Sequence, residues 1–130
     1  MRVLLDTHVW LWMQAEPEKL GSQARALIED SANELLLSAA SVWEIAIKIG
    51  VGKLRLPEPL STYVPSRMQS SGVSALAVAH AHAAAVADLA RHHRDPFDRL
   101  LIAQAITEGV PILSSDAQFD AYESERIDAS

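Results

Sequence analysis

The sequence contains no cysteine. That absence excludes a disulfide-stabilised scaffold and any metal site built from thiolates, and it is compatible with a reducing cytosol. No apolar stretch is long enough to act as a signal peptide, because the first apolar run meets a charge at Asp6. The alanine-rich run at residues 75–90 carries two histidines and an aspartate. We therefore expect no membrane span and a cytoplasmic location.

Common catalytic signatures are also missing. There is no G-x-S-x-G elbow to present a nucleophilic serine, and no glycine-rich loop to cradle a phosphate. A haloacid-type phosphatase needs a second aspartate two residues after the first, and here His8 occupies that position after Asp6. The sequence therefore gives no support to serine nucleophile chemistry or to this kind of phosphotransfer.

Acidic residues outnumber basic ones, 17 against 11, and the formal net charge is −6. Many of the acids lie in residues 116–130, whereas residues 91–99 concentrate arginines and histidines. The overall charge argues against non-specific coating of nucleic acid. It does not exclude a local basic approach to one site.

The 130 residues are 49% hydrophobic and 22% charged, a balance that fits one globular domain spanning residues 1–130. Short apolar runs bounded by turn residues predict buried strands. These runs cover residues 2–5, 34–38, 73–76 and 110–114, and one more edge strand is expected near Arg126–Ile127. Because helical segments separate the runs, the chain is predicted to form an α/β sandwich around a mostly parallel sheet.

Six stretches have helical patterns. Thr7 is expected to cap the first helix and Ser22 the second. The predicted helices span residues 8–14, the residues after Ser22, and residues 39–49, 60–70, 78–92 and 96–108. Gly50 and Gly109 are predicted to end two of them, and Pro65 disfavours helix in the first half of the fourth.

The helix at residues 96–108 raises the first question about function. Asp95 suits an N-cap, Pro96 the first helical position, and Asp98 the acid-favouring first turn. That start also places Asp98 on the face shared by Leu101 and Ala105. A carboxylate that points toward the core is costly unless it meets a cation or several donors. Asp98 is therefore a candidate functional residue.

Two further aspartates follow predicted strands. Asp6 ends the run at residues 2–5, and Asp116 is the first acid after the run at residues 110–114. Ligands of parallel sheets bind outside the carboxyl ends of the strands, so both side chains are expected on the same rim. A structural alternative stays open for each. Asp6 fits a turn that accepts backbone amides, and Asp116 fits the cap of a short helix at residues 117–122.

Glu44 completes the set, because it lies in an apolar helix that is expected to be buried. The alternative for Glu44 is a helical ion pair with Lys48, four residues later. Four carboxylates on one rim would repel one another unless a cation neutralised them. Hard oxygen ligands select Mg²⁺ or Mn²⁺, and water activated by such an ion can attack a phosphodiester. The set therefore predicts a metal-dependent nuclease.

The histidines and tryptophans carry no comparable signal. His80 and His82 lie two residues apart on a predicted helix, so they face different sides and do not chelate together. His92 and His93 suit a helix C-terminus, where positive charge is favourable. We expect the histidines at helix ends and on the surface. We expect the three tryptophans in the core or an interface rather than on a base-stacking platform.

Four separated stretches resemble the PIN-domain family, and within it the VapC-type toxins of bacterial toxin–antitoxin pairs. They are Asp6-Thr7-His8-Val9-Trp10-Leu11-Trp12, Ser41-Val42-Trp43-Glu44-Ile45, Asp95-Pro96-Phe97-Asp98-Arg99 through Ala105, and Ser114-Ser115-Asp116. The stretch from Glu44 to Leu54 is also similar to one VapC subgroup. The resemblance spans nearly the whole chain and keeps the family's order.

The resemblance implies a three-layer α/β/α fold with a parallel sheet of about five strands. It also implies Mg²⁺- or Mn²⁺-dependent endoribonuclease activity, usually on structured RNA such as tRNA or rRNA. The family's acidic residues correspond to Asp6, Glu44, Asp98 and Asp116. Its neighbouring hydroxyls correspond to Thr7 and Ser114, which would orient carboxylates or water. Members pair as homodimers and are silenced by a VapB-type antitoxin whose tail enters the active-site groove.

Basic residues complete the predicted site. Arg99 is a candidate for the scissile phosphate or an antitoxin carboxylate, with a position on the helix surface as the alternative. Weaker candidates for contacts to the RNA backbone are Lys53, Arg55, Arg91 and Arg94. A non-catalytic interaction module with this fold and a nuclease that cuts DNA stay open as alternatives. The acidic tail departs from the family's longer apolar last strand.

Overall fold

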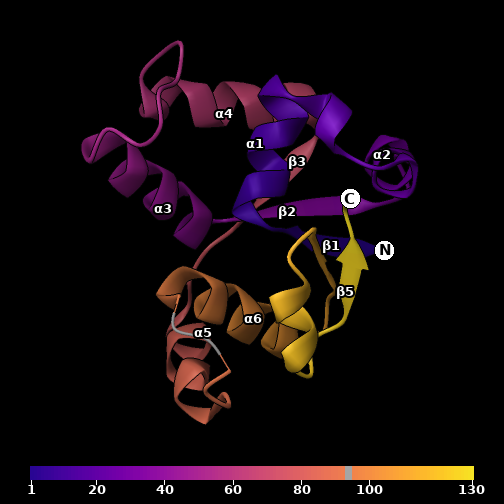
Figure 1. Cartoon of the computed structure of the whole chain (residues 1–130), viewed down its shortest axis with the longest axis vertical. Helices are drawn as coiled ribbons and strands as arrows, with labels where there is room; N and C mark the ends of the chain where they lie inside the picture. Colours follow the sequence, from indigo (N-terminus) through magenta and orange to yellow (C-terminus); the bar gives the residue numbers. More distant parts are fainter. Residues whose placement is uncertain (93–94) are drawn as a thin grey trace.

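The structure is a computed structural model of the chain, and it describes residues 1–92 and 95–130. Five strands form one sheet in which neighbouring strands run parallel, in the order β3-β2-β1-β4-β5 (Figure 1). The strands are β1 (Arg2–Leu5), β2 (Glu34–Ser38), β3 (Val73–Leu76), β4 (Ile112–Ser114) and β5 (Arg126–Asp128). The predicted α/β class, the parallel sheet and the edge strand in the tail are confirmed.

Helices cover both faces of this sheet (Figure 1). The helices are α1 (Thr7–Ala15), α2 (Ser22–Glu29), α3 (Ala39–Gly50), α4 (Leu60–Ser71), α5 (His80–Ala85) and α6 (Pro96–Glu108), with short 3-10 turns η1 (Pro17–Lys19), η2 (Val86–Asp88) and η3 (Ala117–Ala121). The first four pack mainly on one face, and α6 packs on the other with α5 beside it, which confirms the three-layer arrangement. Among the described residues, no helix is long and apolar enough to cross a membrane.

The alternation of side chains along β1 explains why the sheet has a core on each face. Val3 and Leu5 belong to the cluster beneath the first four helices, whereas Leu4 belongs to the cluster beneath α6. All three are fully buried, as expected for the central strand of a covered parallel sheet. Leu101 and Ile102 of α6 fill the second cluster, which confirms the inward face predicted for that helix.

The predicted boundaries of α6 are confirmed. Asp95 is the N-cap, and its Oδ1 accepts hydrogen bonds from the backbone N–H groups of Phe97 at 2.9 Å and Asp98 at 3.2 Å. Gly109 ends the helix with a φ of +67°, a conformation that glycine adopts without strain. The following strand starts later than predicted, because the N–H of Val110 still bonds to the carbonyl of a helix residue.

The continuous helix predicted for residues 78–92 is wrong. Here α5 ends at Ala85, and only the short turn η2 follows. The guanidinium of Arg99 donates to the carbonyl of Ala90 at 2.9 Å and to that of Val86 at 3.3 Å. Carbonyls that a longer helix would have used internally are therefore bonded by a side chain from α6. The alanine-rich composition favoured helix, and this tertiary contact overrides it.

Two predicted helix caps are also wrong. Asp6 and Gly21, rather than Thr7 and Ser22, occupy the N-cap positions of α1 and α2. Thr7 is the first helical residue, and its hydroxyl bonds to a different helix. Pro65 lies inside α4 without ending it, so the disfavoured first half of that helix is present.

Candidate active site

The carboxyl ends of β1 and β4 lie next to each other because the two strands are parallel neighbours, with Leu5 in register with Leu113. Asp6 follows β1 directly, and Asp116 comes two residues after β4. The N–H of Asp6 donates to the carbonyl of Leu113 at 3.0 Å, which extends the ladder to the rim. The structure therefore places these two aspartates on one edge of the sheet, as the sequence predicts.

Ser114 connects the two aspartates. Its hydroxyl is fully buried, donates to Oδ2 of Asp6 at 2.8 Å and accepts the backbone N–H of Asp116 at 3.0 Å. Asp116 in turn accepts the N–H of Gln118 at 2.9 Å, so it also caps η3, as the structural alternative foresaw. One serine thus fixes the positions of both rim acids.

Thr7 and Ser41 connect α1 to α3 behind the rim. Both are buried, and the hydroxyl of Thr7 donates to that of Ser41 at 2.8 Å. Glu44 follows Ser41 by three residues, so the two share a helix face. Ser41 was not singled out in the sequence, although a serine in an otherwise apolar helix is the signal that could have identified it. Glu44 itself is buried, and Lys48 Nζ lies 3.1 Å from its Oε2, so the predicted helical ion pair is present.

The four predicted carboxylates interact electrostatically. Burial, together with the smaller effect of the negative charges of neighbouring acids, raises the pKa of Asp98 to about 8. Those neighbours are, in order of decreasing effect, Asp95, Asp6, Glu44 and Asp116. Burial also raises the pKa of Asp6; the charge of Glu44 adds to that shift, while the hydrogen bond from Ser114 opposes it. The fold therefore brings all four acids into one region of negative charge.

The chemistry of this region fits a hard divalent cation. Oxygen donors are the ligands that Mg²⁺ and Mn²⁺ prefer, and a double positive charge would remove the repulsion that raises the pKa of Asp98. The side chains do not form a finished shell: among the described residues, no three histidine, aspartate or glutamate side chains lie close enough to hold one ion. The metal site at this rim stays a prediction.

Comparison with known proteins identifies the family. The sequence profile of the PIN domain matches residues 3–125. This chain belongs to the PIN-domain family. It is 32% identical to ribonuclease VapC22 of Mycobacterium tuberculosis over 124 residues, which are 95% of this chain and 94% of VapC22. It is 54% identical to ribonuclease VapC16 of the same strain over 63 residues, 48% of this chain, and that match spans only 45% of VapC16.

Solved structures share the fold of this PIN domain. VapBC2 from Rickettsia felis, bound to a promoter DNA fragment, superposes with a TM-score of 0.74 at 14% identity over 100% of both chains. DNA-bound VapBC from Salmonella typhimurium superposes with a TM-score of 0.71 at 18% identity over 98% of both chains. At such identities the likeness establishes the fold alone.

Arg99 of the PIN domain contacts the backbone that follows α5. Its two donated hydrogen bonds go to the backbone carbonyls of Val86 and Ala90. The alternative of a structural role on the surface of α6 therefore fits the geometry better than a direct contact to substrate.

The weaker basic candidates lie in exposed positions. The side chains of Lys53, Arg55 and Arg91 are all exposed, and Arg94, like His93, lies outside the described residues. Lys53 lines a groove that Glu44 also lines. Contacts of these residues with RNA stay predictions.

His82 is not on the surface, contrary to expectation. It is 4% exposed, its Nδ1 accepts the N–H of Ala79 at 2.9 Å, and its Nε2 lies 2.9 Å from Oε2 of Glu108. The adjacent Gln104 is fully buried and accepts the hydroxyl of Ser38. These polar side chains join α5 and α6 to the carboxyl end of β2. We assign them a structural role.

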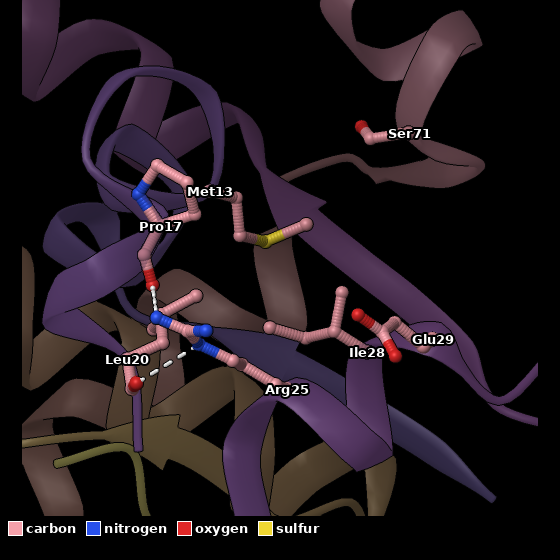
Figure 2. Close-up of a pocket in the computed structure, with 7 residues that line it drawn as sticks. All are labelled: Met13, Pro17, Leu20, Arg25, Ile28, Glu29 and Ser71. Atoms are coloured by element: carbon pink, nitrogen blue, oxygen red, sulfur yellow. Dashed lines mark hydrogen bonds between the residues drawn. The ribbon is translucent and has the colours of Figure 1, made fainter. Parts of the chain in front are cut away.

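A separate hollow of about 360 Å³ lies at the other end of α1 from Asp6 (Figure 2). Met13 lines it, and Arg25 crosses it to donate to the carbonyls of Pro17 at 2.9 Å and Leu20 at 3.2 Å. The residues that line this hollow include no group of converging carboxylates. The candidate active site of the PIN domain is therefore the rim.

Proposed function

We propose that this PIN domain is a divalent-metal-dependent endoribonuclease of the VapC kind, acting as a toxin. The observation that carries the proposal is the interaction of the four rim carboxylates, which contributes to the rise in the pKa of Asp98 to about 8. Acids that repel one another destabilise the fold unless a cation joins them. The names of two relatives, both ribonucleases, support RNA as the substrate. We also propose that residues 1–130 work as a single nuclease domain.

Each rim acid has a task in this proposal. Asp6, Asp98 and Asp116 hold Mg²⁺ or Mn²⁺, directly or through water, and Glu44 orients the attacking water. When bound, the ion supplies charge stabilisation at the phosphodiester and an activated water for in-line attack. Ser114 keeps the carboxylate of Asp6 in one orientation through its 2.8 Å hydrogen bond.

Two further residues position the carboxylates without contacting the scissile phosphate. Thr7 ties the first turn of α1 to α3 through Ser41, and this contact positions the helix face that carries Glu44. Arg99 bonds the backbone after α5 to the start of α6, next to Asp98 in the chain. We assign both residues to positioning the carboxylates rather than to contact with the scissile phosphate.

The proposed toxin has a protein partner. Solved structures that share its fold include VapBC and FitAB complexes. We propose that a VapB-type antitoxin binds this chain and covers the rim, and that the toxin works as a homodimer in the cytoplasm. Structured RNA such as tRNA or rRNA is the proposed target.

Purified wild-type protein and the Asp98→Asn variant test the activity. The wild type is expected to cleave bulk tRNA or rRNA with Mg²⁺ or Mn²⁺ and not with EDTA. Asp98→Asn should stay folded by circular dichroism and lose cleavage by about a thousandfold, since charge stabilisation by a metal amounts to several kcal/mol. The control is Glu29→Gln, at an exposed position on α2, because this substitution also removes one negative charge but does so outside the rim.

The alternatives give different results in the same assay. Equal cleavage by wild type and Asp98→Asn would show that the carboxylates are wrongly assigned. Cleavage of DNA in place of RNA would favour a DNA nuclease, and no cleavage of either polymer would favour a non-catalytic module. Induced expression of wild type and Asp6→Ala, followed by sequencing of RNA ends, tests the toxin role in cells: only the wild type should arrest growth and create new ends.

A further inference from the structure

A pair of aromatic rings stands beside the rim. Trp10 is fully buried and Trp12 packs against the core, which confirms a core position for these two, whereas Trp43 on α3 is 61% exposed. For Trp43 the expected interface position stays a prediction. The ring of Trp43 meets that of Phe97 on α6 in a T-shaped contact, with centroids 5.2 Å apart and planes at 71°. Because the indole of Trp43 is this exposed and lies beside the rim, it is available to contact a ligand.

Each of the two rings belongs to the residue that comes directly before a rim carboxylate in the chain. Trp43 immediately precedes Glu44, and Phe97 immediately precedes Asp98. Successive residues of a helix point about 100° apart, so each ring lies on the flank of the rim rather than inside it. A polymer with a phosphodiester at the rim can therefore place a neighbouring unit against these rings.

The adjoining surface suits a nucleotide. A groove of about 430 Å³ is lined by Phe97, Pro96, Asp95, Glu44, Lys48, Lys53, Ile47 and Val51. Trp43 does not line this groove, but its ring contacts Phe97, which does. Lys48 is paired with Glu44. Lys53 is exposed and has no carboxylate within ion-pair distance among the described residues, which leaves a positive charge at the outer edge of the groove.

We propose that Trp43 is a stacking platform for a base of single-stranded RNA next to the scissile bond, and that Lys53 binds a phosphate of the same strand. The inference rests on the proposed function and adds where the substrate lies. An aromatic face beside a basic side chain is the usual means of holding a single strand, because every base has a π-face and every linkage a charge. A stretch of unpaired nucleotides in a structured RNA is therefore the preferred substrate.

Binding without cleavage tests this directly. The probe is a fluorescein-labelled oligoadenylate of about ten nucleotides, titrated with the full chain in EDTA and followed by anisotropy. Trp43→Ala should raise Kd about tenfold, Trp43→Phe should restore most of the affinity, and Lys53→Gln should weaken binding by about threefold and lower its salt dependence. RNA should quench tryptophan emission in the wild type and not in Trp43→Phe.

The control is Ile106→Ala, which removes another exposed apolar side chain, on α6 beside a different hollow, and should leave Kd unchanged. If Trp43→Ala binds the oligonucleotide as tightly as wild type, the stacking proposal is wrong and the ring serves a protein contact. Absence of binding by the wild type also overturns it. In the Mg²⁺ assay, cleavage lost in Asp98→Asn but kept with an unchanged KM in Trp43→Ala overturns this inference alone; no cleavage by wild type overturns the proposed function as well.

Discussion

Asp6 and Asp116 follow strands at the middle of the sheet, whereas Glu44 and Asp98 lie on helices α3 and α6. The first pair, here the strand half of the site, is held by hydrogen bonds, since the hydroxyl of Ser114 contacts both. The second pair, the helix half, is governed by charge: Glu44 meets Lys48 at 3.1 Å, and the pKa of Asp98 rises to about 8.

This contrast suggests a division of labour. The geometry of the strand half is defined by neutral donors from the backbone and a buried serine, although burial and the charge of Glu44 also raise the pKa of Asp6. The helix half responds to cations and to pH, because its state depends on which positive charge is nearest. The rim thus combines a strand half of fixed geometry with a helix half whose charge state changes when a cation binds.

The largest effect is expected from removing the charge of Asp6 in the strand half. Asp6→Asn keeps the size of the side chain and removes its charge, so cleavage of RNA should fall by about a thousandfold while the fold is retained. The measurement is initial cleavage rate with Mg²⁺ alongside a thermal melt. A rate within tenfold of wild type would place the essential charge elsewhere.

A smaller loss is expected from Ser114→Ala. The variant removes the donor to Asp6 and the acceptor for Asp116 while leaving both acids in place. Groups that orient ligands are worth about 10- to 100-fold in activity or metal affinity. Metal titrations followed by cleavage rate should show that Ser114→Ala needs a higher Mg²⁺ concentration than the wild type to reach half of its maximal rate. Ser66→Ala, an exposed serine on α4, is the control and should behave as wild type.

The helix half predicts an unusual pH dependence of stability. In the metal-free fold Asp98 titrates at about 8, against an ordinary 3.8. Between these values the folded state keeps a proton that the unfolded chain has lost, so the free energy of unfolding should fall as pH rises through that window. Melts in EDTA should show this fall in wild type and a weaker one in Asp98→Asn. Added Mg²⁺ should restore stability at the alkaline end. Parallel slopes in the two proteins would contradict the assignment.

The smallest effect concerns the partner of Glu44. Lys48→Met should lower the stability of the metal-free protein by about 1 kcal/mol or less, because the ion pair is partly exposed. The deficit should shrink when Mg²⁺ is added, since the ion then neutralises Glu44. Lys19→Met breaks an exposed helical pair with Glu16 far from any rim acid, so its deficit should not respond to Mg²⁺. If the stability deficit of both variants stays the same when Mg²⁺ is added, Glu44 does not belong to the cation site.

Local sequence signals were enough for the elements that carry the site. Asp95 and Pro96 set the start of α6, and Gly109 sets its end, because caps act through neighbouring backbone groups alone. The rim position of Asp6 followed from the general geometry of parallel sheets, and the pairing of Glu44 with Lys48 from helix periodicity.

Features that depend on distant partners were not predictable. The break after α5 reflects hydrogen bonds from Arg99, and the burial of His82 reflects its contact with Glu108, 26 residues later. The double use of Ser114 likewise needs a neighbour that only the folded sheet supplies. In each case a tertiary hydrogen bond decides what composition and periodicity leave open.

The hydrogen bond between Asp6 and Ser114 spans 108 residues of chain. On a ribosome Asp6 emerges 108 residues before Ser114, so the rim is incomplete throughout the synthesis of the segment between them. Contacts of such long separation also delay folding. The proposed nuclease would therefore stay inert beside the RNA of its own ribosome until Ser114 and Asp116 have emerged.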